Sequence, residues 1–119
     1  MDAAQPWQPP GLTVREQHGA HARVVIEVSG ELDFAAVGRL RSRLLPATEH
    51  GTVVLDMAGV SFCDSGGIRV LVEAERSARG SGGAFRIAAP SDAVRRVLDL
   101  TNLDQMLEIF PDVDSALNR

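Results

Sequence analysis

Ser65 is the residue whose neighbours most favour a chemical role for a side chain in this sequence. An apolar stretch at residues 53–55, rich in β-branched side chains, is typical of a strand buried on both faces of a sheet. A helical spacing of apolar residues starts just after Gly66 and Gly67. Ser65 is therefore expected where a strand leads into a helix, beside free backbone N–H groups and the positive end of the helix dipole. Such a position would stabilise a phosphate group.

The same position has a purely structural interpretation. Serine is among the residues preferred at the N-cap of a helix, where its side-chain oxygen accepts a hydrogen bond from a backbone N–H group. Ser65 can thus be a capping residue, a phosphate acceptor or both, because N–H groups that favour a hydroxyl also favour a phosphate.

A nucleophilic serine is the second chemistry to consider, since Asp64-Ser-Gly-Gly67 also surrounds the nucleophile of chymotrypsin-like proteases. Those enzymes are all-β and disulfide-rich, whereas this sequence alternates between strand and helix patterns. A serine nucleophile also needs a base within hydrogen-bonding distance. The three histidines are at positions 18, 21 and 50, and His50 is expected at the opposite end of the sheet from Ser65. The sequence therefore does not favour a hydrolase.

Metal binding and cofactor binding have weaker support. His18 and His21 are spaced like metal ligands, but they lie in a predicted turn without a third ligand nearby. Asp56 and Asp64 also lack a third acidic ligand, and Asp56 is expected to fix a turn by a side-chain hydrogen bond. The glycine-rich segment 80–83 lacks the lysine of a phosphate-binding loop. We expect a protein without catalysis, metal or cofactor.

Composition excludes several classes of partner. The formal net charge is −4, and the twelve basic residues are all arginines spread along the chain, whereas nucleic-acid binding relies on clustered basic side chains. The sequence has neither a secretory signal pattern nor an apolar run long enough to span a bilayer. Cys63 is the only cysteine, so no intramolecular disulfide is expected, and a small buried side chain is the favoured interpretation. We expect a cytoplasmic protein that binds neither nucleic acid nor membrane directly.

The length of 119 residues suits one domain. Residues 1–10 are rich in proline and glutamine, which predicts a flexible N-terminal tail before a folded domain at 11–119. Two strands over 12–17 and 22–29, separated by a turn, are predicted to form a hairpin.

Helices and strands then alternate along the chain. Asp33 is expected to cap a helix that has Phe34 on its apolar face and ends at Pro46. The next predictions are a strand over 52–57, a helix over 65–79, a loop over 80–83, a strand over 84–89, a helix opening at 90–92, a strand over 107–110 and a terminal helical turn within 112–117. This order predicts an α/β fold, with a mixed sheet of four to five strands, an N-terminal antiparallel hairpin and three to four helices.

The sequence around Ser65 resembles a family signature. A strand that leads through Val-x-Phe-x-Asp-Ser into a helix is typical of STAS-domain anti-sigma factor antagonists, and residues 55–67 are similar to it, with Leu-Asp-Met-Ala-Gly-Val-Ser-Phe-Cys-Asp-Ser-Gly-Gly. Gly-Glu-Leu-Asp at 30–33 is similar to the end of the family's second strand, and residues 95–103 resemble its late helix. The likeness extends over about residues 12–117 and implies a single STAS domain.

The resemblance implies a regulatory protein without its own catalysis. In its unphosphorylated form such a protein binds an anti-sigma factor, a serine kinase of the histidine-kinase-like ATPase superfamily, and a sigma factor is released. The kinase phosphorylates the serine that corresponds to Ser65, which switches binding off, and a metal-dependent serine phosphatase reverses this. The partner-binding residues implied here are Asp33, Asp64, Ser65, Gly66, Gly67 and Arg69.

One departure and one alternative accompany the resemblance. Many relatives have a second serine where this chain has Gly66, which leaves Ser65 as the only local acceptor. The alternative function is a non-phosphorylated STAS scaffold subunit of a stress-signalling complex or of a lipid-transport ATPase, in which Ser65 only caps the helix.

Overall fold

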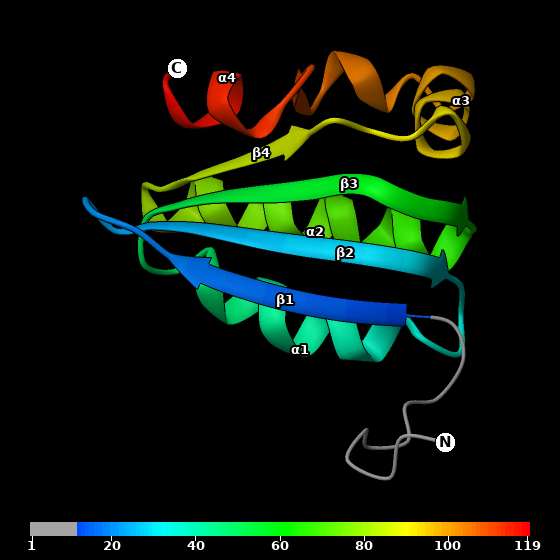
Figure 1. Ribbon diagram of the computed structural model, residues 1–119, viewed down its shortest axis with the longest axis horizontal. Coiled ribbons are helices and arrows are strands. Elements are labelled where there is room, and N and C mark those ends of the chain that lie inside the picture. The colour runs from blue at the N-terminus through cyan, green and yellow to red at the C-terminus, as the bar shows by residue number, and fades with distance from the viewer. Residues whose placement is uncertain (1–11) are drawn as a thin grey trace, which may run out of the picture.

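Five strands form one mixed sheet, which helices cover from both sides (Figure 1). The computed structural model describes residues 12–119, so the tail predicted at 1–10 lies outside the described residues. The elements are β1 (Leu12–His18), β2 (Arg23–Leu32), α1 (Val37–Ala47), β3 (Thr52–Cys63), α2 (Ser65–Ser81), β4 (Ala84–Ala88), α3 (Asp92–Leu100), the 3₁₀-helix η1 (Leu103–Gln105), β5 (Glu108–Phe110) and α4 (Val113–Leu117).

The strands lie in the sheet in the same order as in the sequence. β1 and β2 are antiparallel, with Val14 opposite Val28, whereas every later neighbouring pair is parallel. Along the chain α1 connects β2 to β3, α2 connects β3 to β4, and α3 and η1 precede β5. This arrangement confirms the predicted α/β class, the mixed sheet and the N-terminal hairpin.

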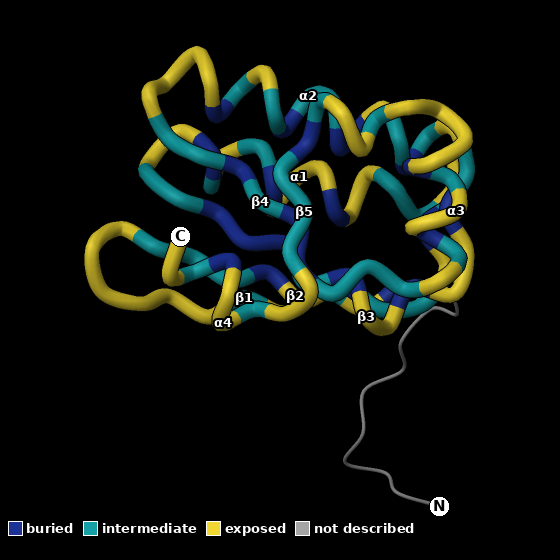
Figure 2. Tube along the Cα trace, turned by 90° about the horizontal axis from the view of Figure 1, so that it is seen from above, coloured by how far each residue is buried: buried dark blue, intermediate teal, exposed yellow. Residues whose placement is uncertain are grey.

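The side chains of β3 alternate between two apolar clusters. Val53 and Leu55 belong to the larger cluster, which also contains the buried residues of α1 and α2. Val54 faces the other way and meets Ala88 and Ala116, the latter on α4. Figure 2 shows α2 and α4 on opposite sides of the sheet. The central strand is therefore covered on both faces, as its unbroken apolar run predicted. Within residues 12–119, every helix is too short or too polar to cross a membrane.

Helix α1 starts later than predicted because a turn precedes it. The N–H of Ala36 donates to Asp33 Oδ1 at 2.9 Å, and the N–H of Val37 donates to the Asp33 carbonyl at 2.9 Å. Asp33 therefore caps this turn, and the prediction that it caps the helix itself is wrong. Phe34 lies in the turn with 84% of its surface exposed, so its predicted place on the apolar face of the helix is also wrong.

Two helices continue past their predicted ends. Pro46 lies within the last turn of α1, and its carbonyl still accepts a hydrogen bond from the N–H of Glu49 at 3.2 Å, so the helix ends at Ala47. A proline this late in a helix removes one N–H donor but does not stop the carbonyl from accepting. Helix α2 extends to Ser81, and Gly82 is its C-cap. The φ of Gly82 is 80°, a left-handed conformation that glycine adopts easily.

Strand β3 extends to Cys63, whereas the sequence predicted an end at Met57. The register with β2 shifts around Gly59, where β3 contains an extra residue. A Cβ on Gly59 would lie 2.6 Å from the Cβ of Ser29, so the bulge needs a glycine. Asp56 Oδ1 accepts the N–H two residues later at 3.1 Å, which is the predicted side-chain bond. The predicted turn is therefore a bulge inside a strand that continues toward Ser65.

Candidate functional site

Two loops meet at the carboxyl ends of β2 and β3. Leu32 and Cys63 are paired at the ends of these parallel strands, so Asp33 and Asp64 follow at the same edge of the sheet. The N–H of Asp64 donates to the Leu32 carbonyl at 3.2 Å, and the N–H of Phe34 donates to Asp64 Oδ2 at 3.0 Å. The loops are thus held together by hydrogen bonds at the edge where α/β folds usually place their sites.

Asp64 is the N-cap of α2. Its Oδ1 accepts hydrogen bonds from the N–H groups of Gly66 and Gly67 at 2.8 and 3.2 Å. The interpretation of Ser65 as the capping residue is therefore wrong, and the expected free N–H groups beside it are already occupied by the Asp64 carboxylate. Ser65 is the first residue of the helix and is exposed. Its hydroxyl is therefore available to a second protein.

The two glycines after Ser65 allow α2 to start close against the strands. A Cβ on Gly67 would lie 2.8 Å from Cys63 Sγ and 2.9 Å from Leu32 Cγ. A Cβ on Gly66 would lie 3.2 Å from the capping carboxylate. The absence of these side chains fixes how closely α2 approaches the sheet, and so fixes the position of Ser65.

Cys63 is buried beneath the loop junction, which confirms the predicted small buried side chain. Burial and, to a lesser extent, the negative charge of Asp64 raise the pKa of its thiol to about 11. Because the thiolate is the reactive form, a thiol with this pKa is inert near neutral pH.

A groove between α1 and α2 leads away from Ser65. It contains two cavities of about 280 and 610 Å³, and Ser65, Arg41, Arg69 and Glu73 line both of them. Arg41 on α1 and Glu73 on α2 form an ion pair with Nη2 and Oε2 2.6 Å apart. Arg69 is exposed about one helical turn beyond Ser65. We call this feature the α1–α2 groove, and its charged lining residues are Arg41, Arg69, Glu73 and Arg76.

The predicted partner-binding residues all lie at this junction or on the first turns of α2, and their role in binding stays a prediction. Sequence reasoning missed three residues nearby, which are Phe34, Arg41 and Glu73. Phe34 lines the smaller cavity and directly follows the Gly-Glu-Leu-Asp that ends a strand, a position that favours a loop. Arg41 and Glu73 have no local signal, because their pairing exists only when the two helices pack together.

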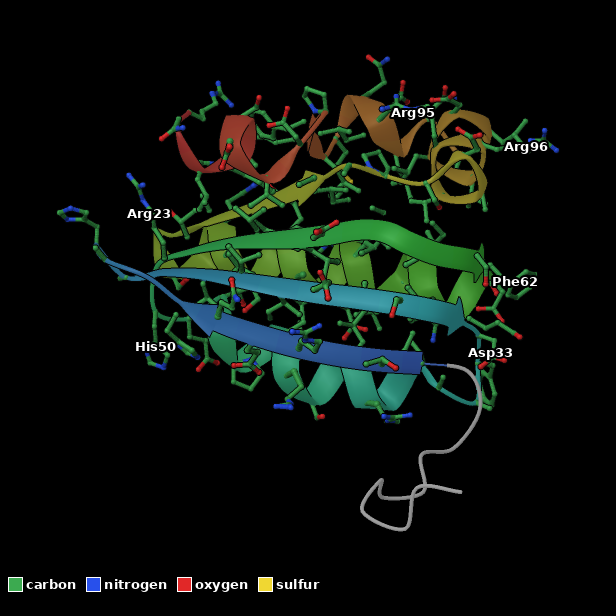
Figure 3. All side chains as sticks on the ribbon, viewed as in Figure 1. Arg23, Asp33, His50, Phe62, Arg95 and Arg96 are labelled. Carbon is green, nitrogen blue, oxygen red and sulfur yellow. The ribbon has the colours of Figure 1, made fainter. Side chains whose placement is uncertain are left out.

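The histidines lie away from Ser65. His50 lies at the opposite end of the sheet from Asp33 and Phe62, as predicted (Figure 3). His18 is exposed and its Nε2 lies 3.1 Å from Glu16 Oε2. No group of three potential metal ligands among His, Cys, Asp and Glu occurs in the part of the chain that the structure describes.

Comparison with known proteins places this geometry in a family. The family model described as the STAS domain matches residues 12–116. The anti-sigma-B factor antagonist of Bacillus subtilis strain 168 is 28% identical over 87 residues, which cover 72% of this chain and 80% of that protein. In two relatives from Thermotoga species the matched segment spans 60% of the relative's own length.

Solved structures show the same fold. An anti-sigma factor antagonist from Mycobacterium paratuberculosis has a TM-score of 0.81 and 27% identity, with 93% of this chain and 95% of that chain covered. The anti-sigma factor antagonist SpoIIAA in its unphosphorylated form has a TM-score of 0.76 and 24% identity, with 90% and 95% covered. Because the family model spans nearly all the described residues, this chain belongs to the STAS domain family, as its resemblance around Ser65 predicted.

Proposed function

We propose that this chain is an anti-sigma factor antagonist whose binding is switched by phosphorylation of Ser65. In its unphosphorylated form it binds an anti-sigma factor, which is a serine kinase of the histidine-kinase-like ATPase superfamily, and a sigma factor is released. The observation that carries this proposal is the exposed Ser65 hydroxyl at the start of α2, freed from capping by Asp64. The name of the Bacillus subtilis relative, an anti-sigma-B factor antagonist, supports it.

The chemical step needs little from this chain. The kinase transfers the γ-phosphoryl group of ATP to Ser65, so that a bond forms between Oγ and phosphorus while the bond to the ADP oxygen breaks. The hydroxyl proton passes to a base of the kinase, and ADP leaves. A metal-dependent serine phosphatase then uses water to release inorganic phosphate and restore the hydroxyl. The chain only has to present that hydroxyl on a rigid, exposed helix start.

The added charge explains how phosphorylation opposes binding. Phosphoserine carries about −1.5 to −2 charges near neutral pH. These charges would lie next to Asp64, which is already an anion in the loop junction. Bringing both against a partner costs like-charge repulsion and desolvation. Since Asp64 remains fixed by its three hydrogen bonds, binding can change while the fold does not.

Exposed apolar side chains at the same end of the sheet supply contact area for the partner. Phe34 is 84% exposed and Phe62 is 48% exposed. Figure 3 shows Phe62 at the same end of the molecule as Asp33. Aromatic side chains are frequent anchors of protein interfaces. We therefore place Phe34 and Phe62 in the partner surface, together with Asp33, Asp64 and the first turns of α2.

Phosphate labelling tests the proposal. Each histidine-kinase-like serine kinase of the source genome is incubated with radiolabelled ATP and the wild-type chain, Ser65→Ala or Ser61→Ala. Ser61 is an exposed serine near the end of β3 and serves as the matched control. We expect label on the wild type and on Ser61→Ala, and none on Ser65→Ala. Label on Ser65→Ala would contradict the proposal. No label on any protein, with partner binding unchanged by Ser65→Ala and Ser65→Asp, would instead support the scaffold-subunit alternative.

A further inference from the structure

A phosphate on Ser65 would find the next three backbone N–H groups of α2 already occupied. The N–H groups of Gly66 and Gly67 donate to Asp64 Oδ1, and the N–H of Ile68 donates to the Asp64 carbonyl at 3.1 Å. The Asp64 carboxylate is moreover a like charge. A group with about −1.5 to −2 charges therefore needs counter-charges from elsewhere on the surface.

Arg69 is the nearest such group along the helix. Residues four apart on a helix lie on the same face, so Arg69 lies one turn above Ser65. The two residues line the same two cavities of the α1–α2 groove. Within residues 12–119, Arg69 takes part in none of the ion pairs, so its guanidinium is free to bind an anion.

Arg41 is the second arginine of the groove and belongs to the other helix, α1. It also lines both cavities, and its ion pair with Glu73 orients it across the groove. The pair uses Nη2 of Arg41, and a guanidinium has five N–H donors in all. Glu73 Oε1 is buried without a hydrogen-bond partner, so the carboxylate is held by Arg41 through Oε2. Arg41 therefore has N–H donors left for an anion while it is paired with Glu73.

We propose that Arg69 and Arg41 form the binding site for the phosphate carried by Ser65. Both guanidinium groups donate charge-assisted hydrogen bonds to the phosphate oxygens. The planar guanidinium of arginine matches phosphate geometry better than the ammonium group of lysine does. This inference rests on the proposed function only for the origin of the phosphate. Side chains of both helices bind the phosphate, because the N–H groups of Gly66, Gly67 and Ile68 are occupied.

The consequence concerns the charge offered to a partner. The α1–α2 groove carries three arginines against one glutamate, on a chain whose formal net charge is −4. Such a basic groove beside Ser65 is complementary to an acidic segment of the partner. A phosphate bound by Arg41 and Arg69 would neutralise it. Phosphorylation would then remove an attraction for an acidic partner segment, in addition to the repulsion next to Asp64.

The test uses the full chain with phosphoserine installed at position 65 by genetic incorporation. A ³¹P NMR pH titration gives the second pKa of the phosphate. Arg69→Gln and Arg41→Gln are each expected to raise this pKa by about 0.2–0.7 unit, the size of one exposed charge pair. Arg96→Gln is the matched control, because Arg96 is an exposed arginine on α3 (Figure 3), and it is expected to leave the pKa unchanged.

Two results would overturn the inference. One is a phosphate pKa in both Arg69→Gln and Arg41→Gln that equals the wild-type value. The other is an equal rise in Arg96→Gln, which would reflect net charge and no specific binding. Because the phosphoserine is installed without a kinase, this titration can succeed when kinase labelling fails, and it can fail when labelling succeeds. The two proposals are therefore rejected by different measurements.

Discussion

Asp64 is the single residue on which the Ser65 site depends most. Its carboxylate accepts the N–H groups of Gly66 and Gly67 on α2 and of Phe34 on the neighbouring loop. Asp64 therefore caps α2 directly after β3 and joins this junction to the loop that follows β2. Its charge also reaches inward, where it contributes to the raised pKa of Cys63.

The pKa of Cys63 predicts how stability depends on pH. Burial raises it from 9.0 to about 11 in the folded chain. Between these values the unfolded chain loses the thiol proton and the folded chain keeps it, so the free energy of unfolding falls as pH rises. The full loss is about 2–3 kcal/mol above the folded pKa. The sequence has no tyrosine or lysine, so no other side chain has its ordinary pKa in this window.

Urea unfolding at several pH values between about 8 and 11 measures this slope. Cys63→Ala is expected to lower the free energy of unfolding at about pH 8, where the wild-type thiol is protonated in both states, and its profile across the window is expected to be flat. A wild-type profile as flat as that of Cys63→Ala would contradict the burial of the thiol.

Local sequence does not determine whether Asp64 or Ser65 caps α2. Aspartate and serine are almost equally good N-cap residues, so adjacent Asp64 and Ser65 cannot be separated by propensity. The choice is made by a contact between distant segments, because only Asp64 also reaches the N–H of Phe34. The motif did locate an exposed hydroxyl at the start of a helix. The Arg41–Glu73 pair could not be predicted, since it depends on how two helices pack.

Helix α2 carries the site, and its start and its end are packed very differently. At its start, Gly67 is buried against Cys63 and Leu32, so the helix has one allowed approach to the sheet. Near its end, Gly80 is exposed, and a Cβ added there would meet nothing within 4 Å. A substitution at Gly67 therefore tests the packing of α2 on the sheet, whereas the same substitution at Gly80 tests only the helix propensity of the residue.

Alanine at these two glycines is expected to act in opposite directions. Gly67→Ala adds a methyl group 2.8 Å from Cys63 Sγ and should lower the free energy of unfolding by about 1–3 kcal/mol. Gly80→Ala, the control, should raise it by about 0.5–1 kcal/mol, because alanine favours a helix and restricts the unfolded chain. Thermal or urea unfolding checks both. A Gly67→Ala chain as stable as the wild type would show that α2 can shift away from the strands.

Regular apolar periodicity predicts the helices and strands correctly, whereas a β-bulge and a turn stabilised by a side chain change the bounds of two others. Strand β4 and helix α4 lie within one residue of their predicted bounds. Ala-Gly after an apolar run favours both a turn and a bulge, so the sequence predicts a turn where the structure has the bulge at Gly59. The sequence predicts too early a start for α1, because Phe34 matches the helical spacing of apolar residues while its backbone belongs to the Asp33 turn.

The whole molecule concentrates its unusual surface at one end. Both faces of the central strands are covered, whereas the end that carries the loop junction exposes Phe62 and, at the basic groove, Phe34. Exposure alone does not identify a partner surface, since Leu100 on α3 is also 78% exposed. What distinguishes Phe34 is that it lines the same cavity as Ser65.

Phe34→Ala is therefore expected to weaken binding to the anti-sigma factor by about tenfold or more, as truncation of an aromatic anchor does. Its free energy of unfolding should change by less than about 0.5 kcal/mol, because the side chain packs on little of the fold. Leu100→Ala is the matched exposed control and should bind as the wild type does. Isothermal calorimetry measures both affinities, and equal losses in the two variants would contradict the placement of the partner surface.

The most direct test of the switch is the affinity of the anti-sigma factor kinase for two forms of this chain, one with serine and one with installed phosphoserine at position 65. Calorimetry with a non-hydrolysable ATP analogue keeps each form unchanged during the measurement. We predict that the phosphorylated form binds about ten- to a hundredfold more weakly, which corresponds to an unfavourable interfacial charge of about 1–3 kcal/mol. Equal affinity of the two forms would contradict the account.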